Sequence, residues 1–177
     1  MKDYSNFLTK CLLAIYLVGL YWIIILKLNV PHIVENRTLN WIPYAAPMVL
    51  NGKIDYGEML LNVLIFVPLG VYSAVLFRLW TTFKHFFLFL STSILLETLQ
   101  WIGKLGSSDV TDVWHNTLGA VLGLFAYNFI RKYLGTDAKA QKWVNVLAVI
   151  LTLVFILFIV YLKVNHLWMF RERTLFR

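Results

Sequence analysis

Six polar residues suited to acid–base, metal-binding or hydrogen-bonding chemistry lie in one short, otherwise apolar stretch of the chain. The stretch is LLETLQWIGKLGSSDVTDVWHNTLGAVLGL, residues 95–124. Its polar members are Glu97, Gln100, Asp109, Asp112, His115 and Asn116. Carboxylates can transfer protons or hold hard cations, and amides can both donate and accept hydrogen bonds. Ionisable groups are costly in apolar surroundings, so their presence here predicts a functional site or close pairing.

The composition predicts that these residues belong to a membrane protein. Of the 177 residues, 60% are hydrophobic and 14% are charged, and the mean hydropathy is +0.71. Five apolar runs are long enough to cross a hydrocarbon core of ~30 Å as helices; they cover residues 7–28, 59–79, 85–103, 113–134 and 143–164. We predict an all-α integral membrane protein, a single membrane domain over residues 1–177 in which about five transmembrane helices form a compact bundle. A Pro-containing loop joins the first two helices.

The charge and cysteine content exclude several other classes of protein. The net charge of +7 comes from Lys and Arg residues between apolar runs, where they set membrane orientation and contact lipid, so we expect no nucleic-acid partner. Cys11 is the single cysteine, which excludes an intramolecular disulfide and a thiolate metal site. We expect no cofactor, and we expect membrane lipid to surround the chain. A homo-oligomer is one possible assembly.

Lys and Arg counts give an orientation in a bacterial cytoplasmic membrane. The N-terminus and the connections after the second and fourth helices hold eight basic residues. The opposite face holds four without the C-terminal tail and eight with it. Because early segments usually dominate insertion, we predict a cytoplasmic N-terminus and an external C-terminus.

Five crossings bring the polar residues to one face. Asn62 begins the second helix, Glu97 and Gln100 end the third, and the residues from Asp109 to Asn116 begin the fourth. Glu97 lies about six residues, or roughly 9 Å, inside the predicted helix end, where a carboxylate should be paired, protonated or functional. We therefore predict a polar cluster at the outer rim.

Small residues and prolines predict how these helices pack. Asp112, Asn116, Gly119 and Gly123 follow a 4-3-4 stripe, and the glycines would let another helix approach closely. If the helix over 85–103 packs there, Glu97 and Gln100 would lie beside Asn116 and Asp112. Pro68 and Gly70 predict a kink in the second helix below the polar rim.

Structural roles compete with functional ones at most of these positions. Asp109 and Asp112 fit a helix N-cap and its acidic first turn. Asn62 and Asn116 suit interhelical hydrogen bonds, and His115 suits an interfacial position. Glu97 is the residue that a purely structural interpretation explains least well.

Four ordered motifs carry a resemblance to a known family. LNWIPY, NVLIFVPLG, ETLQ and GSSDVTDVWHNTLGAVLG lie between about residues 38 and 124, and this region resembles the VanZ-like membrane proteins. On this resemblance, the family's recurring positions fall on Asn40, Pro43, Asn62, Pro68, Gly70, Glu97, Gln100, Asp109, Asp112, Asn116 and Gly119. Gly106, Ser107 and Ser108 stand where many members carry an Arg or an aromatic residue. The fifth helix lies outside the region and is expected to be specific to a subgroup.

Three function classes remain open. The resemblance implies a cell-envelope protein that reduces susceptibility to teicoplanin and related lipoglycopeptides by binding the drug or a lipid-linked cell-wall precursor. An enzyme acting on a lipid-linked substrate is the second class, with Asp109, Asp112 and His115 as a weak candidate metal site. A transporter or a structural partner protein is the third, and five helices without an inverted repeat argue against an autonomous transporter.

Overall fold

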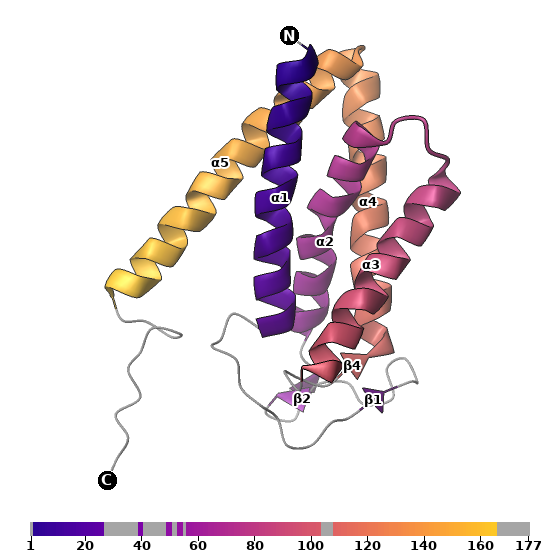
Figure 1. Cartoon of the computed structure of the whole chain (residues 1–177). Coiled ribbons are helices and arrows are strands. Elements are labelled where there is room, and N and C mark those ends of the chain that lie inside the picture. Colours follow the sequence, from indigo (N-terminus) through magenta and orange to yellow (C-terminus); the bar gives the residue numbers. More distant parts are fainter. Residues whose placement is uncertain are drawn as a thin grey trace.

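Five long helices make up most of the described structure, a computed structural model that covers residues 2–26, 39–40, 49–50, 53–54, 56–103 and 108–165 (Figure 1). The helices are α1 (Lys2–Leu26), α2 (Tyr56–Leu76), α3 (Thr82–Ile102), α4 (Val110–Leu134) and α5 (Asp137–Val164). They confirm the predicted all-α bundle. Of the LNWIPY motif, the structure describes only the first two residues. The other four, Pro43 among them, lie outside the described residues.

Each helix begins before the apolar run that predicted it. The start lies three residues earlier in α2, α3 and α4, and five or six residues earlier in α1 and α5. Polar caps account for three of these starts, since Thr81, Asp109 and Thr136 each accept a hydrogen bond from a backbone N–H of the first turn. A hydropathy pattern misses these turns because they are polar.

Four of the described helices, α1, α2, α3 and α5, are long and apolar enough to cross a membrane. The remaining helix, α4, has 25 residues and so spans about 38 Å, but it is less apolar than the other four helices. It lies against α2 and α3 within the bundle (Figure 1). Three of its polar residues, Thr111, Asn116 and Thr117, are buried and so contact protein, which is where a membrane helix tolerates them.

The closest packing in the described chain joins α2 to α4 through glycines on both helices. A Cβ atom at Gly119 would overlap the carbonyl oxygen of Val63, and one at Gly123 would overlap that of Val67. In the other direction, a Cβ atom at Gly70 would overlap the backbone of α4 at Ala120. The glycine stripe thus receives α2, whereas the sequence suggested the helix over 85–103. Gly70 permits this contact, and α2 runs through Pro68 without interruption.

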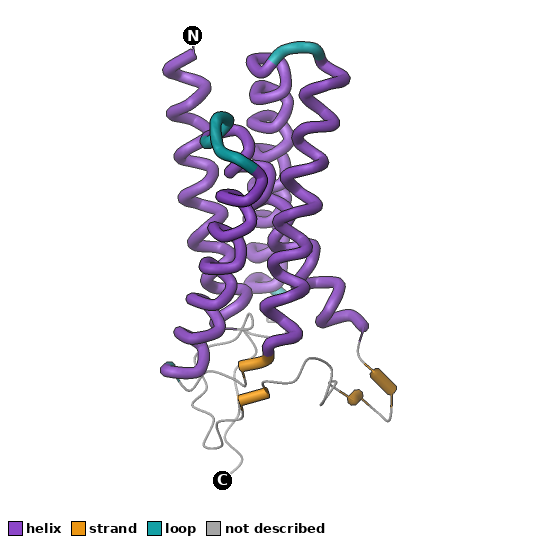
Figure 2. The backbone as a smooth tube through the Cα atoms, turned by 90° about the vertical axis from the view of Figure 1, so that its right-hand side faces the viewer, coloured by secondary structure: helices purple, strands orange, loops and turns teal. Residues whose placement is uncertain are grey.

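Short paired strands lie at one end of the bundle (Figure 2). β1 (Leu39–Asn40) pairs in parallel with β4 (Ser108–Asp109), and β2 (Val49–Leu50) pairs antiparallel with β3 (Lys53–Ile54). The first pair ties the connection after α1 to the start of α4. The strand residues described in the expected loop therefore lie at the same end as the polar helix termini.

The opposite end holds two tight connections. One joins α2 to α3, and the other joins α4 to α5 around Gly135, whose φ of 75° favours glycine. From this end α5 runs obliquely away from the other helices (Figure 1), and most of its side chains beyond Asn145 are exposed. These exposed side chains are largely apolar, as expected for a lipid-facing surface.

Candidate functional site

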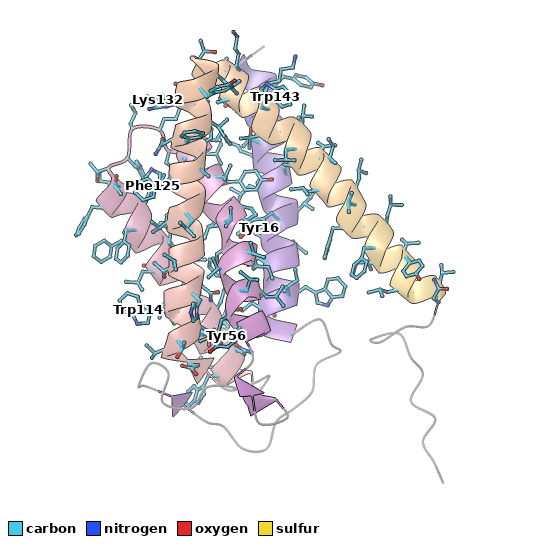
Figure 3. The ribbon with its side chains drawn as sticks, turned by 180° about the vertical axis from the view of Figure 1, so that it is seen from behind. Tyr16, Tyr56, Trp114, Phe125, Lys132 and Trp143 are labelled. Carbon is cyan, nitrogen blue, oxygen red and sulfur yellow. The ribbon has the colours of Figure 1, made fainter. Side chains whose placement is uncertain are left out.

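The polar residues predicted from the sequence gather where α3 ends and α4 begins. Glu97 and Gln100 lie on α3, Asn116 lies on α4, and their side chains are only 4%, 2% and 0% exposed. The exposed aromatic residues Tyr56 and Trp114 lie at the same end of the bundle (Figure 3), as is typical of a membrane–water interface. The cluster is thus buried within protein close to an expected membrane surface.

Asp109 positions the start of α4. Its side-chain Oδ1 accepts a hydrogen bond from the Thr111 N–H at 2.7 Å, which makes Asp109 the N-cap predicted from the sequence. Its own N–H donates to Glu97 Oε2 on α3 over a longer distance of 3.4 Å. The buried carboxylate of Glu97 therefore faces the backbone just ahead of α4.

Asp112 and Asn62 connect α4 to α2. Asn62 Nδ2 donates to Asp112 Oδ1 at 2.7 Å, a short bond of the charge-assisted kind. Asp112 also lies in the first turn of α4, where a negative charge interacts favourably with the helix dipole. This contact brings the start of α2 to the cluster, as the topology predicted.

Asn116 connects α4 to α3. Its Nδ2 donates to Ser93 Oγ at 3.0 Å, and both side chains are fully buried. Ser93 was not among the site residues predicted from the sequence. The signal was present, because Ser93, Glu97 and Gln100 are spaced by four and three residues and so share one face of α3.

Two buried amide atoms in the cluster have no hydrogen-bond partner within the described part of the chain. They are Gln100 Nε2, a donor, and Asn116 Oδ1, an acceptor. An unsatisfied buried polar atom costs about 1–3 kcal/mol, so such atoms call for a partner. The cluster therefore offers one buried donor and one buried acceptor in addition to the Glu97 carboxylate.

The backbone of Asn40 also reaches this end. The parallel pairing of β1 with β4 sets Asn40 opposite Asp109. The described contacts thus join Asn40 to Asp109 and Asp109 to Glu97, and separately join Asn62 to Asp112 and Asn116 to Ser93. Gln100 shares the buried face of α3 with Glu97. The glycines pack α2 against α4 beside them.

The weak candidate metal site is not supported by the geometry. Among the described residues, no three His, Cys, Asp or Glu side chains converge as a group able to hold a metal ion, and this includes Asp109, Asp112 and His115. The cluster is better suited to hydrogen bonding, since its buried members are one carboxylate, two amides and a hydroxyl group.

Comparison with known proteins shows which family the chain resembles. A protein-family comparison matches the family described as VanZ/LLP1 over residues 13–131, a longer region than the motifs alone indicated. The chain is also 31% identical to "Protein VanZ" of Enterococcus faecium over 166 residues, which cover 92% of this chain and 99% of that protein. No solved structure matches.

The two matches differ in whether they reach α5. The family match ends at residue 131, before α5 begins, whereas an alignment that covers 92% of the chain must include part of the 28-residue α5. Similarity to that relative therefore extends beyond the region of the family match. On the strength of both matches, this chain is a member of the VanZ/LLP1 family.

Proposed function

We propose that this protein lowers the susceptibility of a bacterial cell to teicoplanin and related lipoglycopeptides. It would do so by binding the drug, or a lipid-linked cell-wall precursor, at the polar cluster of α3 and α4. Membership of the VanZ/LLP1 family supports a resistance-associated membrane protein. The cluster supplies the candidate binding residues.

One observation carries the assignment of the cluster. Glu97, Gln100 and Asn116 are almost fully buried, and two of their amide atoms have no partner within the described residues. A polar group with peptide or sugar hydrogen-bonding atoms would satisfy both amides, and its lipid tail could remain in the surrounding bilayer. Both candidate ligands are amphiphiles of this kind.

The proposal requires this end of the bundle to face outside. Seven of the eight basic residues counted for the N-terminal face belong to the described side chains and lie toward the opposite end. The positive-inside tendency would hold that end in the cytoplasm. The cluster would then face the outside of the cell, from which the drug arrives.

The test is teicoplanin susceptibility in a sensitive bacterial host that expresses the full chain. We expect the wild type to raise the inhibitory concentration and Glu97→Gln to remove most of that increase, because the variant keeps the shape of the side chain but loses its charge. Thr98→Val is the matched control, since Thr98 is the exposed neighbour of Glu97 on α3. Membrane levels are compared through an epitope tag.

Two outcomes would contradict the proposal. Full protection by Glu97→Gln at equal abundance would remove the cluster from the function. Absence of protection by the wild-type chain at a verified membrane level would remove the resistance function itself.

A further inference from the structure

A second polar region lies at the other end of the bundle, around a cavity of about 720 Å³. The cavity is lined by the first part of α1, the end of α2 with the α2–α3 connection, and the start of α5. Its polar lining residues are Asn6, Lys10, Arg78, Thr136, Asp137 and Gln141, which we call the basic pocket. Its volume falls within the range of small-molecule sites.

Hydrogen bonds fix Arg78 in place at this pocket. Its Nε donates to the carbonyl oxygen of Val75 at 3.0 Å, and its Nη2 donates to Gln141 Oε1 at 2.7 Å. Gln141 is held in turn, because its Nε2 donates to Asn6 Oδ1 at 2.8 Å and to Thr9 Oγ1 at 3.0 Å. The guanidinium group is thus oriented by three separate segments before any ligand arrives.

The charges around the pocket favour an anion. Asp137 is shared, since its carboxylate oxygens lie 3.5 Å from Arg78 Nη1 and 3.6 Å from Arg131 Nη1. Lys10 adds a second cation to the lining, so the lining carries two positive charges and one carboxylate, and that carboxylate also pairs with Arg131 outside the lining. The N-terminal end of α5 also lines the pocket, and its helix dipole adds positive potential.

Exposed aromatic and basic residues indicate that the pocket lies at headgroup depth. Trp143 and Lys132 lie at this end of the bundle (Figure 3), and Trp80, which lines the pocket, is partly exposed. Trp side chains favour the membrane–water interface, where Lys side chains extend toward the headgroups. Leu79, also in the lining, is 98% exposed and would contact lipid.

We propose that the basic pocket binds the phosphate group of an anionic phospholipid. Arg78 and Lys10 would contact the phosphate, and the lipid chains would extend past the exposed apolar residues beside the pocket. This site is separate from the polar cluster of α3 and α4 and does not depend on the resistance function.

The test measures lipid retained by the purified full chain. The protein is equilibrated in detergent with equal amounts of phosphatidylglycerol and phosphatidylcholine, and bound lipid is counted by native mass spectrometry. We expect the wild type to retain about one phosphatidylglycerol in preference to phosphatidylcholine. Lys10→Gln should lower this retention about fivefold, the change expected for one basic contact with an anionic lipid.

Lys132→Gln is the matched control, because Lys132 is an exposed lysine at the same end and outside the pocket. It should change retention less than twofold. Equal losses in the two variants, or equal retention of both lipids by the wild type, would overturn the proposal. Both Lys side chains are exposed, so neither substitution should prevent folding.

A second arm separates lipid phosphate from soluble phosphate. Inorganic phosphate is added to the lipid-free protein and to the protein that carries phosphatidylglycerol. The lipid site is supported if inorganic phosphate displaces the retained phosphatidylglycerol only when the phosphate concentration is high. The contrary result would be a protein that inorganic phosphate stabilises against unfolding but that retains no lipid selectively. If Lys10→Gln also removed that stabilisation, the pocket would bind soluble phosphate, and the proposal of a lipid phosphate would be overturned.

Discussion

At the scale of single residues, the bond from Asn62 Nδ2 to Asp112 Oδ1 shows how one amide joins two helices at the site. The distance is 2.7 Å, and both side chains are partly buried. In a membrane protein such bonds contribute on average about 0.6 kcal/mol and at most about 1.7 kcal/mol. The charged acceptor places this bond toward the upper end of that range.

Asn62→Ala should therefore lower the free energy of unfolding in detergent by about 1–2 kcal/mol. Asn128→Ala, at an exposed asparagine of α4, should leave it nearly unchanged. Unfolding followed by circular dichroism in a denaturing detergent gives both values, and a double-mutant cycle with Asp112→Ala isolates the pair. A coupling energy near zero would show that the bond does not stabilise the fold.

The sequence revealed the residues of the cluster better than their partners. Glu97, Asp109 and Asn116 could be placed at one end because helix lengths and membrane crossings determine which termini meet. The N-cap role of Asp109 also followed from local rules. The bond between Asn116 and Ser93 did not, because a lone serine in an apolar helix gives little signal until the facing helix is known.

At the scale of elements, the contact between α2 and α4 depends on glycines that meet a backbone. The GAVLG pattern correctly predicted a close helix approach, but its suggested partner was wrong. A pattern of small residues indicates that another helix can approach closely, but it does not indicate which helix that is. The information lay on α2, where Val63, Val67 and Gly70 have the complementary spacing of four and three residues.

Gly119→Ala should destabilise the bundle by about 1–3 kcal/mol, the usual cost of overpacking. The added methyl group would overlap the carbonyl of Val63, which belongs to backbone and cannot rotate away. Gly19→Ala is the control, since no atom lies within 4 Å of a Cβ at that position. Thermal unfolding in detergent should show a lower Tm for Gly119→Ala alone, and equal Tm values would contradict the packing argument.

At the scale of the whole molecule, the bundle separates two polar regions that lie at opposite ends. The cluster of α3 and α4 lies beside the short β1–β4 pairing, whereas the basic pocket lies where α1, α2 and α5 meet. Among the described residues, the hydrogen bonds of Asn145 and Gln141 to α1 hold α5 at the second end, and farther along Phe155 makes an edge-on ring contact with Trp22 of α1. Hydropathy predicted five crossings but could not predict this oblique course, because a uniformly apolar helix gives no preferred face.

The orientation of the chain in the membrane decides which of the two polar regions faces the cytoplasm. The two ends of α3 provide a matched pair of positions for testing this orientation. Thr82 begins α3 at the basic end, Gly103 follows α3 at the cluster end, and both are exposed. Single cysteines are introduced at each position after Cys11→Ser removes the native thiol. Because basic residues favour the cytoplasm, a membrane-impermeant maleimide should label Gly103→Cys in intact cells and Thr82→Cys only after permeabilisation. The reverse pattern would place the cluster of Glu97 in the cytoplasm and contradict its role as an external binding site. Labelling of both positions in intact cells would contradict the crossing of α3 itself.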